Sequence, residues 1–132
     1  MDDGHIPSSS QSPWLPFESR RRARDEKREA VLRTAVALFL EQGYHRATLN
    51  EVARRLNITK PALYNYFRSK DEILYECWSI GNELVDDCIA ETSAAGGSGL
   101  DKLRKLIVRY AELMTEDYGK SLVRFDLRDL SE

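Results

Sequence analysis

The sequence contains little cysteine and histidine. It has two cysteines, Cys77 and Cys88, and two histidines, His5 and His45. If one helix holds both cysteines, their α-carbons lie about 16 Å apart, which is too far for a disulfide bond within that helix. The histidines show no spacing typical of metal ligands. We therefore expect two buried thiols and neither a metal site nor a cofactor.

Long apolar runs are also missing. No stretch of eighteen uninterrupted apolar residues occurs, and the first residues lack the basic and then apolar order of a signal peptide. This predicts a cytoplasmic protein without a membrane segment. No pattern places a catalytic base beside a nucleophile, so we expect a protein other than an enzyme.

Proline is scarce after the first residues. Three of the four prolines lie within residues 1–19, together with a run of serines. This composition predicts a disordered N-terminal arm over residues 1–19. Four arginines follow, at positions 20, 21, 22 and 24, and a basic arm of this kind can contact DNA phosphates or enter a minor groove.

The net charge of −2 conceals two segments of opposite charge. From Glu18 to Lys70, 13 basic residues stand against 6 acidic ones, whereas from Asp71 to Glu132 the counts are 7 and 14. A basic segment suits a polyanion, because its side chains release condensed counterions when they contact phosphates. The alternative is that the two surfaces only keep the protein soluble or pack against each other.

The apolar periodicity predicts helices throughout the rest of the chain. No segment alternates as a strand would, so we expect an all-α fold. The predicted helices span residues 24–42, 49–56, 60–67, 70–91 and 100–117, and a further one starts within 121–130.

Residues that favour caps and turns separate these helices. Thr48 with Glu51 predicts a capping box before the second helix, and Ser69 opens the fourth helix in the same way. Asn57 tolerates a left-handed turn, after which we expect Ile58 to point inward and Thr59 to cap the third helix. Two short helices joined by a tight turn in a basic segment predict a helix-turn-helix that binds DNA.

This interpretation depends on the side chains at the outer face of the third helix. Leu63 and Phe67 are expected to face the core. The side chains expected outside are Lys60, Pro61, Tyr64 and Asn65, with Tyr66 on the flank and Thr59 at the tip. Lys and Asn can hydrogen-bond base edges, Pro can contact a thymine methyl group, and Tyr hydroxyls suit phosphates. Alternatively, the tyrosines are core residues and the lysines are only solvated.

The stretch GYHRATLNEVARRLNITKPALYNYFRSKDEIL resembles the signature of the TetR/AcrR family. The similarity covers residues 25 to 80. It implies a three-helix DNA-binding domain over residues 20–69, followed by a partial helical domain for ligand binding and dimerisation over residues 70–132. It also implies two sets of DNA contacts. Thr48, Tyr64, Tyr66 and Lys70 would hold phosphates, and Thr59, Lys60, Pro61, Ala62 and Asn65 would contact bases or line that contact.

The same resemblance implies a homodimer that binds a palindromic DNA operator, usually to repress, and releases it with a small-molecule effector. The effector is expected to be apolar or amphipathic. The candidate pocket residues are Cys77, Trp78, Cys88, Tyr110 and Met114, although such residues are more often core. The competing interpretation is a helical interaction module whose basic face is incidental.

Overall fold

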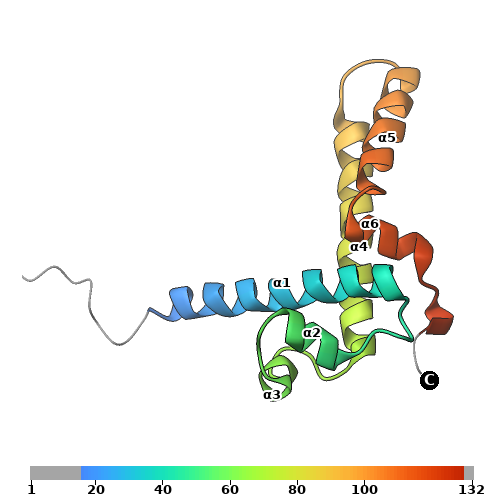
Figure 1. Cartoon of the computed structure of the whole chain (residues 1–132). Helices are drawn as coiled ribbons and strands as arrows, with labels where there is room; N and C mark the ends of the chain where they lie inside the picture. Colours follow the sequence, from blue (N-terminus) through green and yellow to red (C-terminus); the bar gives the residue numbers. More distant parts are fainter. Residues whose placement is uncertain (1–15, 130–132) are drawn as a thin grey trace, which may run out of the picture.

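The computed structural model describes residues 16–129 and places them in helices and connecting turns (Figure 1). Within this part of the chain no strand occurs, and the predicted all-α fold is confirmed. The elements in chain order are α1 (Phe17–Gln42), α2 (Leu49–Arg55), α3 (Lys60–Tyr64), α4 (Lys70–Ala94), α5 (Gly99–Leu113), α6 (Asp117–Arg124) and the 3-10 turn η1 (Leu127–Asp129).

The first helix is longer than the sequence predicts. It begins at Phe17 instead of residue 24, and the amide of Arg20 bonds the carbonyl oxygen of Pro16 at 3.1 Å. Residues 17–19 of the expected arm therefore belong to α1, and residues 1–15 lie outside the described part. The helix ends at Gln42 and is capped by Gly43, whose φ of 87° a side chain would disfavour.

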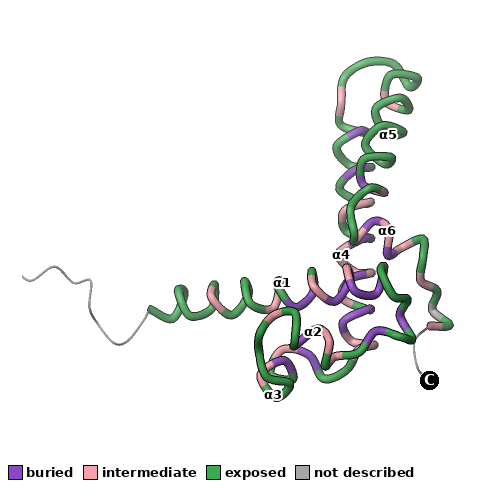
Figure 2. The backbone as a smooth tube through the Cα atoms, in the orientation of Figure 1, coloured by how far each residue is buried: buried purple, intermediate pink, exposed green. Residues whose placement is uncertain are grey.

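One core joins α1, α2, α3 and the beginning of α4. Figure 2 shows that buried residues gather where the second half of α1 meets these elements. Phe39, Val52 and Leu63 are completely buried there, as are Ile73 and Cys77 of α4. This core thus continues past residue 69, at which the sequence divides the two expected domains.

The second half of the molecule is built on α4. Figure 1 shows α4 crossing the end of α1, with α5 returning along it and α6 near the crossing. The Trp78 indole N–H donates to the carbonyl oxygen of Ser121 at 3.1 Å, and the Tyr118 hydroxyl donates to Glu29 of α1 at 3.2 Å. Helix α6 is therefore bonded to both α4 and α1.

Two predicted helix boundaries in this half are wrong. The fifth helix ends at Leu113 instead of residue 117, and the sixth begins at Asp117 instead of within residues 121–130. A Cβ on Gly119 would lie 2.1 Å from the carbonyl oxygen of Leu113, so only glycine permits this close approach.

The apolar side of α5 is largely uncovered. Leu103, Ile107 and Tyr110 lie on this side and are 51%, 59% and 45% exposed. Of the residues in α5, only Leu113 is buried. The packing of α5 on α4 therefore leaves most of its apolar stripe open.

Two further expectations can be compared with the structure. Both cysteines are free and buried, as the spacing predicts. Within residues 16–129, none of the helices combines the length and apolar character needed to span a bilayer.

Candidate nucleic-acid interface

The turn between α2 and α3 depends on Asn57. Its φ of 53° makes it the one residue other than glycine with positive φ in the described range, as the sequence predicts. The next amide, of Ile58, bonds the carbonyl oxygen of Ala53 at 3.0 Å and closes the corner. The Ile58 side chain is 36% exposed, so the expectation that it points inward is wrong. The backbone, and not this side chain, holds the turn.

Two threonines cap the helices of this motif. The Thr48 hydroxyl oxygen accepts from the amide of Glu51 at 3.2 Å, and that of Thr59 accepts from the amide of Ala62 at 3.3 Å. Each hydroxyl uses a lone pair in its cap and keeps its own proton for another acceptor. Both residues are exposed, so a phosphate oxygen could accept that proton.

The predicted capping box at Thr48 forms only by half. The Glu51 carboxylate bonds Arg54 at 2.8 Å and also pairs with Arg55, which in turn pairs with Glu41. The Arg54 hydrogen bonds, helped by its charge and by Arg55, lower the pKa of Glu51 to about 2. Two of the basic residues of α2 are therefore already neutralised by partners on the protein.

The outer face of α3 has the composition that the sequence predicts. Leu63 and Phe67 are completely buried, whereas Lys60, Pro61 and Asn65 are exposed, and Tyr64 is 43% exposed. The Lys60 ammonium group lies 5.8 Å from the centre of the Tyr64 ring. This places a cation beside an aromatic ring on the open side of the helix.

The other candidates on this element lie deeper. Ala62 and Tyr66 are half-buried. The helix itself ends at Tyr64, earlier than the predicted residue 67, because the amide of Asn65 bonds Ala62 three residues back instead of Pro61 four residues back. Asn65 thus caps the helix, and its side chain emerges at its end.

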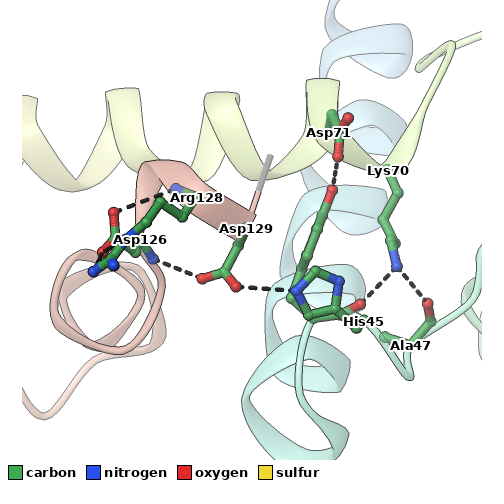
Figure 3. Close-up of polar contacts among 8 residues, drawn as sticks. His45, Ala47, Lys70, Asp71, Asp126, Arg128 and Asp129 are labelled. Atoms are coloured by element: carbon green, nitrogen blue, oxygen red, sulfur yellow. Dashed lines mark hydrogen bonds and ion pairs between the residues drawn. The ribbon is translucent and has the colours of Figure 1, made fainter. Parts of the chain in front are cut away.

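Lys70 holds the loop that precedes α2. Its ammonium group donates to the carbonyl oxygen of Tyr44 at 2.7 Å and to that of Ala47 at 3.2 Å (Figure 3). The same group lies 4.3 Å from the centre of the Tyr44 ring, and partial burial lowers the pKa of Lys70. Two of the three N–H donors of the expected phosphate ligand are therefore used within the protein.

Further contacts fix the same loop from both sides. The Tyr44 hydroxyl donates to Asp71 at the start of α4, and the His45 ring pairs with Asp129 of η1 at 3.1 Å (Figure 3). The structure thus connects the loop before α2 to the second half of the molecule. Sequence reasoning did not indicate these contacts, since residues 71 and 129 lie far from the loop along the chain.

Arg28 is a further residue that the sequence analysis did not single out. Its guanidinium lies 4.6 Å from the centre of the Phe67 ring and pairs with Glu76 at 2.8 Å. It therefore links α1, the end of the α3 segment and α4. Its place one helical turn before the buried Leu32 is the signal that could have indicated it.

The structure does not bring the five candidate pocket residues together. Trp78 and Tyr110 line one open groove of about 990 Å³, with Asn82, Val85 and residues of α6 and the segment after it. Cys88 lines a separate groove with Asp87, Glu91 and residues of α5 and its end. Cys77 is enclosed in the core, where burial raises its pKa to about 12, and Met114 lines neither groove.

Comparisons with known proteins agree with this architecture. Residues 31–77 match the family described as bacterial regulatory proteins, tetR family. The HTH-type transcriptional regulator AcrR of Shigella flexneri is 28% identical over 100 residues, which are 74% of this chain and 46% of that protein. The HTH-type transcriptional activator FasR of Mycolicibacterium smegmatis is 43% identical over 53 residues, 40% of this chain and 24% of that protein.

A solved structure is similar over most of the described helices. The TetR family transcriptional regulator PfmR of Thermus thermophilus superposes with a TM-score of 0.68 at 26% identity, covering 76% of this chain and 56% of that one. The chain spans about half the length or less of these three relatives.

Proposed function

We propose that the chain, whose residues 31–77 match the tetR family of bacterial regulatory proteins, is a transcriptional regulator of that family and binds duplex DNA sequence-specifically through α2 and α3. The observation that supports this most strongly is the two-sided α3. Leu63 of α3 and Phe67 just after it are completely buried, whereas Lys60, Tyr64 and Asn65 are exposed. A helix of this kind can enter a major groove and hydrogen-bond base edges.

The candidate residues divide into two roles. Thr59, Lys60, Pro61, Ala62 and Asn65 contact or line the bases. Thr48, Tyr64, Tyr66 and Lys70 contact or position the phosphates. The half-buried Ala62 and Tyr66 shape this surface more than they contact DNA directly. Lys70 acts mainly by fixing the loop that carries Thr48, because its ammonium group bonds two carbonyl oxygens of that loop.

We further propose that the protein acts as a homodimer. Two copies would place their α3 helices in successive major grooves of a palindromic operator, because half-sites one helical turn apart suit a two-fold symmetric protein. We expect the bound dimer to repress, in the bacterial cytoplasm, and to have no enzymatic activity of its own.

An effector would bind in the groove lined by Trp78 and Tyr110. Its walls combine apolar side chains with Asn82, Arg124 and Asp126, which suits an amphipathic small molecule. Trp78 lies eight residues after Lys70 on α4, and α6 bonds both α4 and α1. A ligand that favours one position of α4 would therefore also shift the loop before α2.

The test is selection of bound sequences from a pool of random duplexes. We expect enrichment of one palindromic sequence, with half-sites about 10 base pairs apart or a multiple of that spacing. Binding without any enrichment would favour the interaction module with an incidental basic face, and would contradict the proposal.

The effector site has its own test on the selected duplex. A compound that releases this duplex from the intact protein should lose its effect in Tyr110→Ala. Tyr75→Ala is the matched control, because Tyr75 is 63% exposed on α4 and does not line the groove. Equal loss of response in both variants would contradict this location.

A further inference from the structure

The first half of α1 projects beyond the body of the protein. Figure 1 shows it extending past α2 and α3, and Figure 2 shows that this part is almost wholly exposed. Residues 17–30 carry six basic and four acidic side chains. This part of α1 contributes no residue to the core, which begins at Val31. Apart from Arg28 and Glu29, which bond α4 and α6, this part of the helix gains little from packing and calls for another explanation.

One side of this projection continues the buried stripe of α1 with positive charges. Positions 20, 24, 27 and 31 follow one another at intervals of four, three and four residues, so they lie on one face of the helix. Val31 is buried in the core at 2% exposure, whereas Arg20, Arg24 and Lys27 are exposed. The stripe therefore changes from apolar to cationic where α1 leaves the body.

The cationic stripe, which consists of Arg20, Arg24 and Lys27, lies beside the end of α3. Arg20, Arg24 and Lys27 line a groove of about 530 Å³ together with Asn65 and Tyr66. Among residues 16–129, the three cations take part in none of the ion pairs, in contrast to Arg28, Arg33, Arg54 and Arg55. The groove is thus a positively charged surface continuous with the outer face of α3.

We propose that this groove binds the phosphate backbone of the duplex that α3 contacts, outside the bases that α3 reads. The inference rests on the proposed function and adds a second contact surface to it. Unpaired cations beside Asn65 and Tyr66 suit a polyanion that already lies against these two residues. Arg20 and Lys27 are separated by about 10 Å along the helix axis, so the stripe can follow neighbouring phosphates.

The width of α1 indicates that this segment contacts backbone phosphates and does not enter the minor groove. A basic arm in an extended conformation could enter a minor groove, but residues 17–27 are helical. An α-helix with its side chains is about 10–12 Å across, whereas the minor groove of B-DNA is about 6 Å wide. The segment therefore lies along the backbone.

The test compares charge removal on two faces of the same helix. The intact chain and Arg20→Gln/Arg24→Gln are titrated with random-sequence duplex across a range of salt concentrations, because phosphate contacts need no operator. Each lost contact lowers the slope of log affinity against log salt by about 0.9. The slope should fall by about 1.8, so the difference from the wild type shrinks about 12-fold between 50 and 200 mM salt.

Two control variants isolate the position of the charge and the charge itself. Arg21→Gln/Arg22→Gln removes the same charge from side chains that do not line the groove, and should change the slope by less than half as much. Arg20→Lys/Arg24→Lys keeps the charge, and its slope should equal that of the wild type. Circular dichroism of each variant checks that α1 remains helical.

The outcomes separate this proposal from the proposed function. Equal slopes for the two glutamine variants, or a reduced slope for the lysine variant, would contradict phosphate binding by this groove. Either result would leave the proposed duplex binding by α2 and α3 in place. Failure of the intact chain to bind any duplex would overturn both.

Discussion

The ammonium group of Lys70, the first residue of α4, donates a hydrogen bond of 2.7 Å to the carbonyl oxygen of Tyr44 in the loop before α2. This bond connects the helix that carries Trp78, in the groove proposed for the effector, to the segment that presents Thr48. A contact inside the protein therefore explains why position 70 is a lysine. The ammonium group keeps one N–H for a phosphate, since its other bond goes to Ala47.

Replacing Lys70 by methionine should therefore loosen the loop before α2. Because two charge-assisted hydrogen bonds are lost, we expect the free energy of unfolding to fall by about 1–3 kcal/mol in a urea titration. Affinity should fall about equally for selected and random duplexes, since we propose that the loop presents Thr48 to a phosphate and not to a base. Lys105→Met, on the exposed side of α5, is the control and should change stability by less than about 0.5 kcal/mol. Unchanged stability of Lys70→Met, or a loss limited to the selected duplex, would contradict this role.

Substitutions at two adjacent residues of α3 should affect stability and duplex binding separately. Leu63 is completely buried, so Leu63→Ala should lower the free energy of unfolding by about 2–5 kcal/mol. Tyr64→Phe removes only an exposed hydroxyl group and should change stability by less than about 0.5 kcal/mol while weakening duplex binding. Thermal unfolding and a fluorescence binding assay measure the two effects. If Tyr64→Phe binds as tightly as the wild type, its hydroxyl contacts no phosphate.

Gly119 should be indispensable to the junction of α5 and α6. A Cβ there would collide with the carbonyl oxygen of Leu113, so Gly119→Ala should cost about 1–3 kcal/mol of stability. Gly99→Ala is the matched control, since a Cβ at the first residue of α5 meets open space. Chemical denaturation of both variants gives the comparison. Equal stabilities would show that α6 can move aside without cost.

Local patterns allowed the order of the helices and the two faces of α3 to be predicted. The four-residue spacing of Leu63 and Phe67 places both side chains on the inner face, and Thr59 and Asn57 identify the turn. These features depend on neighbours within one or two helical turns. For that reason the sequence alone located the helix-turn-helix and the exposure of Lys60, Tyr64 and Asn65.

Features that depend on distant residues were not predictable in this way. The capping box at Thr48 forms by half because Arg54 and Arg55 compete for the Glu51 carboxylate. Proline and serine suggested an arm up to residue 19, yet α1 already begins at Phe17, directly after Pro16. The hydrogen bonds from Lys70 to the carbonyl oxygens of Tyr44 and Ala47, which lie 26 and 23 residues before it, are of this kind.

The groove proposed for the effector illustrates the same limit. The sequence shows which residues of α4 and α5 are aromatic or sulfur-bearing. Only the fold decides which of these side chains line the same groove. Trp78 and Tyr110 line one groove, whereas Cys88 lines another. Helical periodicity reports the face on which a residue lies, and it does not report which element covers that face.

The central claim is that the exposed side of α3 reads bases. Its most direct test is to repeat the selection from random duplexes with Lys60→Ala and Asn65→Ala beside the wild type. Each variant should lose preference at particular positions of the selected sequence, corresponding to about 1–3 kcal/mol per contact, while its affinity for random duplex falls much less. Identical selected sequences from all three proteins would contradict base recognition by this helix.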